Sequence, residues 1–289
     1  MSDLIQESYM TNAYLNMSEQ LYHSDPCPEP SLSASIAKIL HTQTPRHAYL
    51  KHPKLGKSGF STSARFDLGR AAHSMLLEPE KENVIAVDSE NWRCKETKLR
   101  RDEIHAQGKI PMLIEEYSKI ELMASIARDF IRRTSISEKF FASDKEVSLI
   151  AKDGCWLRGR LDAISKDRTL IIDYKTVPSA NPDSFLRSSV FQYGYDIQAA
   201  MYIYLNKLTG HKGKCTYMFV LQEIEAPYSC SLVQCDQSII DCGSIKLGSS
   251  INQWSRCLAD NEWPEYGHEP YNIEAPAWRL DDFEMLKFN

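Results

Sequence analysis

The sequence predicts an α/β fold of the α+β kind, with a mixed sheet and an N-terminal helical elaboration. Two observations support this fold class. Apolar residues recur at helical spacing through much of the first 134 residues, and the pattern then changes to short strands followed by one helix and one strand. At 289 residues and 43% hydrophobic composition, the chain can bury a sizeable core. We expect one structural domain, in which a loop and helix extension of residues 1–65 packs on a core of residues 66–289.

The first half of the chain is predicted to begin as loop and to continue as helices. Prolines at positions 26, 28 and 30 interrupt any regular element before the first helix. Ser31 or Ser33 is the expected N-cap of that helix, and a Gly/Ser-rich stretch at 56–63 separates it from the second. The helices are predicted over 31–40, 66–77 and 111–134.

The second half is predicted to open with three short strands. Turn residues at 152–154 and 166–168 separate segments that are rich in β-branched and aromatic residues. The predicted strands are Glu146–Ile150, Cys155–Ile164 and Thr169–Lys175. A helix over Asp196–Leu208 and a strand over Lys214–Leu221 complete the pattern.

Composition restricts the classes of function. No run approaches the roughly 20 apolar residues of a membrane-spanning helix, and the N-terminus has no basic start followed by an apolar stretch, so we expect a soluble, cytoplasmic protein. The net charge of −5 does not indicate nucleic-acid binding, although the run Arg93–Arg101 is basic and could either contact DNA or form a solvated helix face. The eight cysteines form no C-x-x-C pair. Reduced thiols are therefore expected, with an iron–sulfur cluster as the alternative.

Two of the predicted strands, Cys155–Ile164 and Thr169–Lys175, are close enough in sequence to form a hairpin. If the turn between them contains two residues, Asp162 faces Asp173 across the hairpin. Because side chains alternate along a strand, Asp173 and Lys175 share one face, and Asp162 joins them there. A three-residue turn would shift this register.

Two aspartates on one face indicate a bound cation. Carboxylates about 5 Å apart repel each other unless positive charge lies between them, and oxygen ligands of this kind suit Mg²⁺ or Mn²⁺. Such an ion can polarise a phosphate and lower the pKa of an attacking water, and Lys175 beside it could stabilise the transition state. The apolar residues Leu170–Ile172 indicate a strand that is buried on both faces, where charged groups rarely occur without partners or metal.

The residues around these aspartates resemble the motifs of RecB-like PD-(D/E)XK nucleases, in the same order. The motifs are G-x-x-x-H at Gly69 and His73, G-x-x-D at Gly159 and Asp162, D-Y-K-T at Asp173 to Thr176, and Q-x-x-x-Y at Gln198 and Tyr202. The chain further resembles the exodeoxyribonuclease VIII (RecE-type) nuclease domains of phages and prophages. The additional elements are Tyr-His at 22–23, Ser-Leu-Ser at 31–33, Thr-Pro-Arg-His-Ala at 44–48 and Trp-Pro-Glu-Tyr at 263–266. The resemblance covers about residues 20 to 280.

The resemblance implies a restriction-endonuclease-like nuclease core and a role for each motif residue. It implies that His73, Asp162, Asp173 and the Tyr174 carbonyl bind the metal and that Lys175 is the catalytic lysine. Gln198 and Tyr202 would position the site or the DNA backbone. Relatives often carry glutamate at the position of His73, whereas the RecE-type branch has histidine.

Several of these roles have a structural alternative. A histidine on an apolar helix is more often a core residue, but its motif context favours the metal role for His73. Tyr202 fits equally well as a core aromatic. Glu146 could reach the metal, although a solvated strand end is the simpler expectation. Arg158 and Arg160 flank the site and could contact phosphate or form surface ion pairs.

The sequence therefore predicts a hydrolase, and the resemblance makes it a Mg²⁺- or Mn²⁺-dependent exodeoxyribonuclease that digests double-stranded DNA from 5′ to 3′ in phage-type recombination. The resemblance also implies its partners, which are double-stranded DNA ends, a phage single-strand annealing protein and further copies of the chain in a homo-oligomer. If phage-encoded, the protein would act in the bacterial host cell. The alternatives are a metal-dependent endonuclease on the same core and a catalytically idle DNA-binding scaffold.

Overall fold

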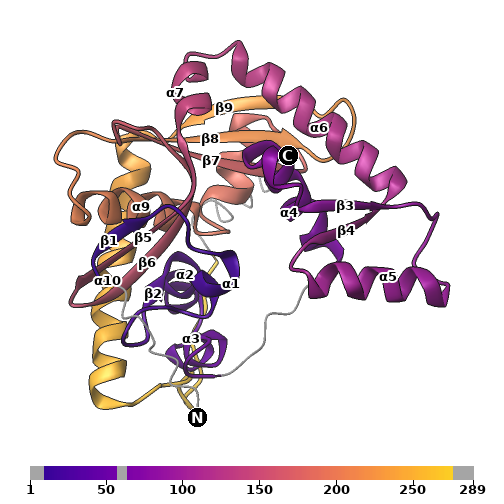
Figure 1. The fold of residues 1–289 in the computed structure, drawn as a ribbon. Coiled ribbons are helices and arrows are strands. Elements are labelled where there is room, and N and C mark those ends of the chain that lie inside the picture. The colour runs from indigo at the N-terminus through magenta and orange to yellow at the C-terminus, as the bar shows by residue number, and fades with distance from the viewer. Residues whose placement is uncertain (1–9, 57–63, 276–289) are drawn as a thin grey trace, which may run out of the picture.

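The computed structural model describes residues 10–56 and 64–275, and its centre is a seven-stranded mixed sheet (Figure 1). The strands of this sheet are β1 (Asn12–Tyr14), β2 (Leu32–Ser33), β5 (Asp144–Asp153), β6 (Cys155–Ile164), β7 (Leu170–Val177), β8 (Thr216–Glu223) and β9 (Cys230–Gln234). Their order is β1-β5-β6-β7-β8-β9, and β2 pairs with β6 outside this path. Within this sheet the β7–β8 and β2–β6 pairs are parallel, and the other strand pairs are antiparallel. The predicted fold class, a mixed α/β structure with a mixed sheet, is confirmed.

The β6–β7 hairpin has the predicted register but a longer turn. Ala163 pairs with Ile172 and Ile164 with Ile171, which is the alignment that places Asp162 opposite Asp173. The backbone N–H of residue 165 donates to the carbonyl oxygen of residue 170, so four residues rather than two form the turn. Paired residues of the β6–β7 ladder end at Ala163, because the two strands separate beyond that point.

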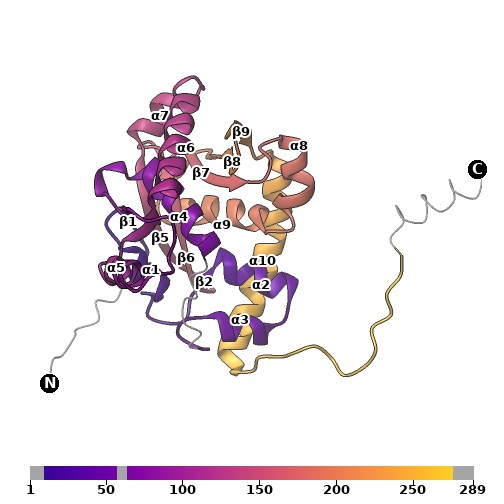
Figure 2. The same ribbon diagram turned by 90° about the vertical axis from the view of Figure 1, so that its right-hand side faces the viewer.

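Helices cover both faces of the sheet, and each face has its own apolar core (Figure 2). The helices are α1 (Glu19–His23), α2 (Ala34–Thr42), α3 (Pro45–Lys51), α4 (Ala64–Leu77), α5 (Lys95–Ala106), α6 (Ile114–Arg132), α7 (Ser137–Ala142), α8 (Pro182–Phe185), α9 (Tyr195–Leu208) and α10 (Gln237–Asp260), with a 3-10 turn η1 (Pro79–Lys81) and a π-helical segment η2 (Leu186–Val190). Side chains of α2, α9 and α10 pack on one face. Side chains of α4, α6 and α7 pack on the other.

The predicted helices are present, with shifted ends. Ser33, one of the two expected caps, accepts a hydrogen bond from the backbone N–H of Ile36 at the start of α2. Helix α6 begins at Ile114 rather than at residue 111, because residues 110–113 form β4 (Ile110–Leu113). That strand pairs with β3 (Val84–Val87) in a small parallel sheet beside the main one (Figure 1). The Gly/Ser-rich stretch predicted at 56–63 lies, after Gly56, outside the described residues.

Helix α10 was not predicted from the sequence. Its 24 residues include two glycines and several serines, which have low helix propensity. Gly243 explains part of this composition, because a Cβ atom there would lie 2.0 Å from the Asp196 carbonyl oxygen of α9. The close approach of α9 and α10 therefore requires glycine at this position.

The segment before residue 65 contributes directly to the main sheet. Strand β1 pairs with β5, and β2 pairs with β6. The division into an extension of residues 1–65 and a core of residues 66–289 remains a proposal. Within residues 10–56 and 64–275, none of the helices combines the length and hydrophobicity that crossing a bilayer requires.

Candidate active site

The separation of β6 and β7 creates the centre of the candidate site. Asp162 lies on β6 next to Ala163, the last residue of this strand that pairs with β7. Its Oδ2 accepts a hydrogen bond of 2.8 Å from the backbone N–H of Tyr174 on β7. The side chain thus fills the space where the backbone ladder stops. Burial alone would raise the pKa of Asp162, but the charges of His73 and Lys175 lower it, so the carboxylate form is favoured.

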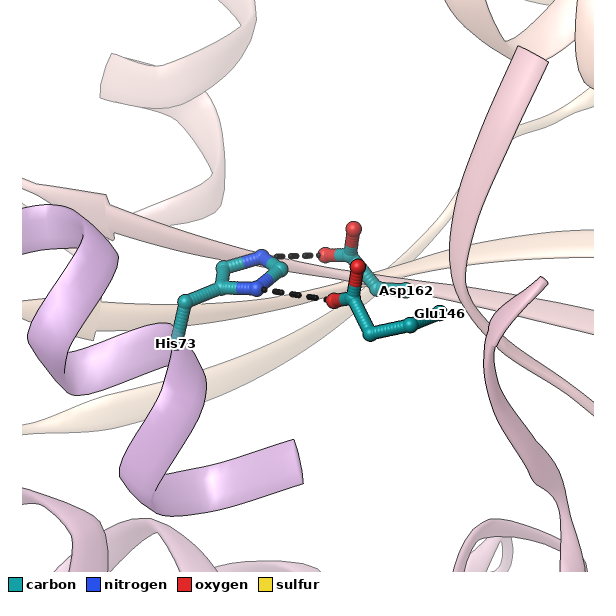
Figure 3. Close-up of side chains that lie close together, drawn as sticks. All are labelled: His73, Glu146 and Asp162. Atoms are coloured by element: carbon teal, nitrogen blue, oxygen red, sulfur yellow. Dashed lines mark ion pairs between the residues drawn. The ribbon is translucent and has the colours of Figure 1, made fainter. Parts of the chain in front are cut away.

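Helix α4 brings His73 to this carboxylate. His73 Nε2 lies 2.7 Å from Asp162 Oδ2, and Nδ1 lies 3.4 Å from Glu146 Oε1, so the imidazole sits between two carboxylates (Figure 3). Burial lowers the pKa of His73, but the negative charges of Asp162 and Glu146 outweigh it and raise the pKa to about 10. The D-Y-K-T strand is also close to this helix, since a Cβ atom at Gly69 would lie 3.6 Å from Thr176 Oγ1.

Glu146 is a site residue that the sequence analysis assigned to a solvated strand end, and that expectation is wrong. Its side chain is only 17% exposed and its Oε2 accepts a 2.6 Å hydrogen bond from Arg160 Nε. Its backbone has a φ of +53°, and the pairing of β5 with β6 skips this residue. The structure therefore marks Glu146 by an irregularity in the pairing of β5 with β6. The sequence contains no pattern from which this irregularity could have been predicted.

Asp173 and Lys175 on β7 form the second half of the site. Asp173 is fully buried, and its Oδ2 accepts hydrogen bonds of 2.7 Å from Gln198 Nε2 and 2.9 Å from the Tyr217 hydroxyl. Asp173 Oδ1 lies 2.5 Å from Lys175 Nζ but accepts no aligned hydrogen bond from any described residue. Burial and the charge of Asp162 raise the pKa of Asp173 to about 6, against the opposing charge of Lys175.

Lys175 is buried beside two carboxylates, which determines its charge state. Burial alone would lower its pKa, but the charges of Asp173 and Asp162 raise the pKa above its ordinary value. The ammonium form is therefore stable at neutral pH, and the side chain is a donor of hydrogen bonds rather than a base. The Nζ atom lies 4.9 Å from the centre of the Tyr195 ring.

The G-x-x-D and Q-x-x-x-Y motifs pack against each other. A Cβ atom at Gly159 would lie 2.8 Å from the Tyr202 ring and 2.9 Å from Leu205, so only glycine leaves room for this contact between β6 and α9. Tyr202 is buried, and its ring lies 6.3 Å from that of Tyr217. It therefore packs in the core beneath the site, as the structural alternative expected, and a direct role for it remains a prediction.

The two arginines of β6 are not arranged as the sequence analysis expected. Arg158 is buried and pairs with Asp25 at 3.2 Å, so it is neither a surface ion pair nor available to phosphate. Arg160 is mostly buried and donates to Glu146 and to the backbone oxygen of Met17. Arg158 therefore connects the N-terminal segment to β6, and Arg160 connects both that segment and β5 to β6, close to Asp162.

Two other sequence features contribute no side chain to the candidate metal group. The basic run Arg93–Arg101 falls largely on α5, whose side chains are mostly exposed, so the expected solvated helix face is present and a DNA contact remains a prediction. The eight cysteines are free thiols. Among the described residues, the group of His, Cys, Asp and Glu side chains close enough to share a metal ion is His73, Glu146 and Asp162.

This group fits a divalent cation. The ligand atoms of His73, Glu146 and Asp162 all lie within 4.8 Å of one another, and two carboxylates with one imidazole are a donor set that hard and intermediate divalent ions accept. Asp173 is a further buried carboxylate whose charge interacts with that of Asp162, and its Oδ1 lies 2.5 Å from Lys175 Nζ. A cation bound through one ring nitrogen of His73 would displace the proton on that nitrogen.

Comparison with known proteins agrees with this fold. The family model "PDDEXK-like domain of unknown function (DUF3799)" matches residues 33–274. The crystal structure of a candidate exonuclease from Eubacterium rectale aligns with a TM-score of 0.61 and 14% identity, over 92% of this chain and 97% of that chain. The crystal structure of SSO0001 aligns over 67% of this chain and 87% of that chain, with 16% identity and a TM-score of 0.27 that supports no argument. No curated protein sequence is significantly similar.

The predicted resemblance to PD-(D/E)XK proteins is therefore confirmed at the level of the family. The match includes every motif residue of the candidate site, from His73 on α4 to Tyr202 on α9. Proteins of the PD-(D/E)XK class typically depend on divalent metal ions, which agrees with the donor set that α4, β5 and β6 bring together. Because the match covers most of the chain, this protein belongs to the family of PDDEXK-like domains DUF3799.

Proposed function

We propose that this protein is a deoxyribonuclease that uses Mg²⁺ or Mn²⁺ to hydrolyse phosphodiester bonds. The observation that supports this most strongly is the convergence of Asp162, Asp173 and Lys175 at the fork between β6 and β7. Two carboxylates and an ammonium group meet there in a largely buried setting. Buried charges are paired or bind metal ions, and clusters of buried ionisable groups with shifted pKa values are frequent at functional sites.

In this proposal His73, Glu146, Asp162 and Asp173 hold the cation, together with the Tyr174 carbonyl that the family resemblance implies. When bound, the cation supplies Lewis-acid polarisation of the scissile phosphate and lowers the pKa of the attacking water. The ligand side chains are already oriented by other groups of the chain. Gln198 and Tyr217 fix Asp173 through hydrogen bonds, and the Tyr174 backbone N–H fixes Asp162.

Lys175 has a separate task in this mechanism. Its ammonium group remains charged at neutral pH, because Asp173 and Asp162 raise its pKa. It can therefore donate hydrogen bonds to a phosphate oxygen on which negative charge develops in the transition state. The aromatic face of Tyr195 limits the positions that the ammonium group can take.

The finer assignment rests on the RecE-type resemblance. We propose an exonuclease that digests double-stranded DNA from 5′ to 3′ in phage-type recombination, acting in the cytoplasm as a homo-oligomer and with a single-strand annealing protein as partner. The similarity in fold to a candidate exonuclease agrees with this proposal. Activity on nick-free circular duplex would instead indicate an endonuclease.

Digestion of end-labelled linear duplex DNA with Mg²⁺ or Mn²⁺ tests the proposal. We expect wild type to shorten the DNA and Asp173→Ala to lose cleavage while it retains most DNA binding, because the lost carboxylate serves hydrolysis more than docking. A chelator should also abolish cleavage. Cleavage that continues in Asp173→Ala, or in wild type with chelator, would contradict the proposed site, and a wild type that neither cleaves DNA nor binds Mn²⁺ would favour the idle scaffold.

A further inference from the structure

Three aromatic residues between positions 191 and 195 lead from the protein surface to the candidate active site. We call Phe191, Tyr193 and Tyr195 the aromatic row. Tyr195 is partly buried at the start of α9, whereas Phe191 and Tyr193 are 45% and 51% exposed. The rings of Tyr193 and Tyr195 lie 5.8 Å apart. Exposed aromatic rings in succession are unusual on a surface without a ligand, because each leaves apolar area in water.

A lysine from a different element lies over each ring of the row. Lys38 Nζ of α2 is 5.3 Å from the Tyr193 ring, Lys246 Nζ of α10 is 5.1 Å from the Phe191 ring, and Lys175 Nζ of β7 is 4.9 Å from the Tyr195 ring. Lys246 also pairs with the buried Asp196, whereas Lys38 has no ion pair with any residue that the structure describes. Lys175 and Lys246 are each paired with a buried aspartate, so Lys38 is the cation over the row that has no acidic partner among the described residues.

The row is held in place by its surroundings. The Tyr195 ring stacks on the buried Phe185 ring at 5.7 Å with an interplanar angle of 21°. Gly194, between the two tyrosines, has a φ of +67°, and the Lys38 side chain packs on it so closely that a Cβ atom would lie 3.0 Å away. The segment before the row is the π-helical η2, a form that is frequent at functional sites. Packing therefore holds Tyr195, and Lys38 packs on the turn that carries Tyr193.

We propose that the aromatic row stacks on unpaired bases of the DNA strand that reaches the active site, while Lys38 and Lys246 contact its phosphates. This inference rests on the proposed nuclease function and specifies the form of its substrate. An intact duplex presents phosphates and sugars but hides the faces of its bases, so exposed rings would gain nothing from it. A strand with unpaired bases offers ring faces for stacking and phosphates for the lysines, and this combination is what single-strand-binding surfaces supply.

Binding measurements with the full chain test the inference. Ca²⁺ replaces Mg²⁺ to limit cleavage, and the probes are a single-stranded oligonucleotide, an abasic oligonucleotide of equal length and a blunt duplex. The double variant Phe191→Leu/Tyr193→Leu removes both exposed rings and keeps apolar side chains. Phe191→Tyr/Tyr193→Phe retains the rings, and Phe141→Leu is the matched control, because Phe141 is 46% exposed on α7 and also lies beneath a cation, that of Arg132.

We expect the double leucine variant to bind the single strand at least about tenfold more weakly than wild type, since each stacked base contributes strongly to such binding. Its affinity for the abasic strand and the duplex should stay within about twofold of wild type. The ring-retaining variant and Phe141→Leu should bind all three probes as wild type does. A 2-aminopurine base in the single strand should lose its quenching on the double leucine variant.

Four results would overturn the inference. The first is a wild type that does not bind the single strand, and the second is a double leucine variant that binds it as wild type does. The third is an equal loss of affinity for the abasic and the base-containing strands. The fourth is a change of oligomeric state in the double leucine variant, which would assign the row to contact with another protein chain. Cleavage of duplex DNA by wild type with Mg²⁺ is measured separately. It remains if only the inference fails, and it is absent if the proposed function fails.

Discussion

Replacing the buried Asp25 with asparagine should weaken the fold that supports the active site. Asp25 Oδ2 lies 3.1 Å from His52 Nε2 and Oδ1 lies 3.2 Å from Arg158 Nη1, with all three side chains at most 5% exposed. The carboxylate also accepts hydrogen bonds from the backbone N–H and the hydroxyl of Ser31. Through Arg158 this network holds the N-terminal segment on β6, the strand that carries Asp162. Asparagine suits the backbone, since residue 25 has a φ of +63°.

The size of the effect follows from the pKa of Asp25. Burial would raise this pKa, but the hydrogen bond from His52, the charge of Arg158 and the bonds from Ser31 lower it from its ordinary 3.8 to about 2. Such a difference corresponds to about 2.5 kcal/mol of folding free energy, and leaving Arg158 buried without its partner can raise the cost of Asp25→Asn to about 3 to 5 kcal/mol. Because the folded-state pKa is lowered, the contribution is fully present above pH 3.8 and is lost as the pH falls through about 2.

Urea unfolding of wild type, Asp25→Asn and the exposed control Asp88→Asn measures this contribution. At pH 7 we expect Asp25→Asn to be less stable by about 3 kcal/mol or more, and Asp88→Asn to be unchanged. The difference between wild type and Asp25→Asn should shrink as the pH falls from 4 toward 2. A difference that is absent at pH 7, or that does not change with pH in this range, would refute the reasoning.

Three further predictions concern the site itself. Gly159→Ala should lower the free energy of unfolding by about 1 to 3 kcal/mol, because its Cβ would lie 2.8 Å from the Tyr202 ring, and an unchanged urea midpoint would contradict that contact. Glu146→Gln should lower the pKa of His73 from about 10, because one of its two neighbouring negative charges is removed. NMR titration of the imidazole in the presence of a chelator measures this pKa, and the same pKa in variant and wild type would show that the two side chains do not interact. Gln198→Ala should reduce the DNA cleavage rate with little change in DNA affinity, because Asp173 loses a 2.7 Å hydrogen bond, whereas a loss of affinity alone would assign Gln198 to DNA binding.

The part of the site formed by β6 and β7 could be predicted because its determinants are local. The apolar run Leu170–Ile172 and a short connection were enough to set the register that brings Asp162 near Asp173. Simple alternation does not continue through Asp162, because Leu161 and Ala163 pack in different cores. The turn proved longer than expected, but it gained one residue at each end about the same centre, so the register was preserved. The resemblance of motifs then added His73 and Gln198, which no strand pattern could place.

The rest depended on contacts between distant segments. Glu146 lies in the candidate site because α4 brings His73 to it, and Arg160 pairs with its other carboxylate oxygen. Arg158 is buried because Asp25 and Ser31, from the N-terminal segment, surround its guanidinium group. Neither environment leaves a periodic signal in the sequence. Helix α10 was missed for a similar reason, since its glycines and serines reflect close packing on α9 rather than local helix preference.

The central claim is that a divalent cation binds where Asp162 of β6 meets His73 and Glu146, and calorimetric titration with Mn²⁺ tests it most directly. We expect wild type and the exposed control Asp88→Asn to bind Mn²⁺ with equal affinity and to release a proton as they do so. Asp162→Asn should bind at least about tenfold more weakly, since it removes a carboxylate at the centre of the donor set. Equal Mn²⁺ affinity of Asp162→Asn and wild type would contradict the account.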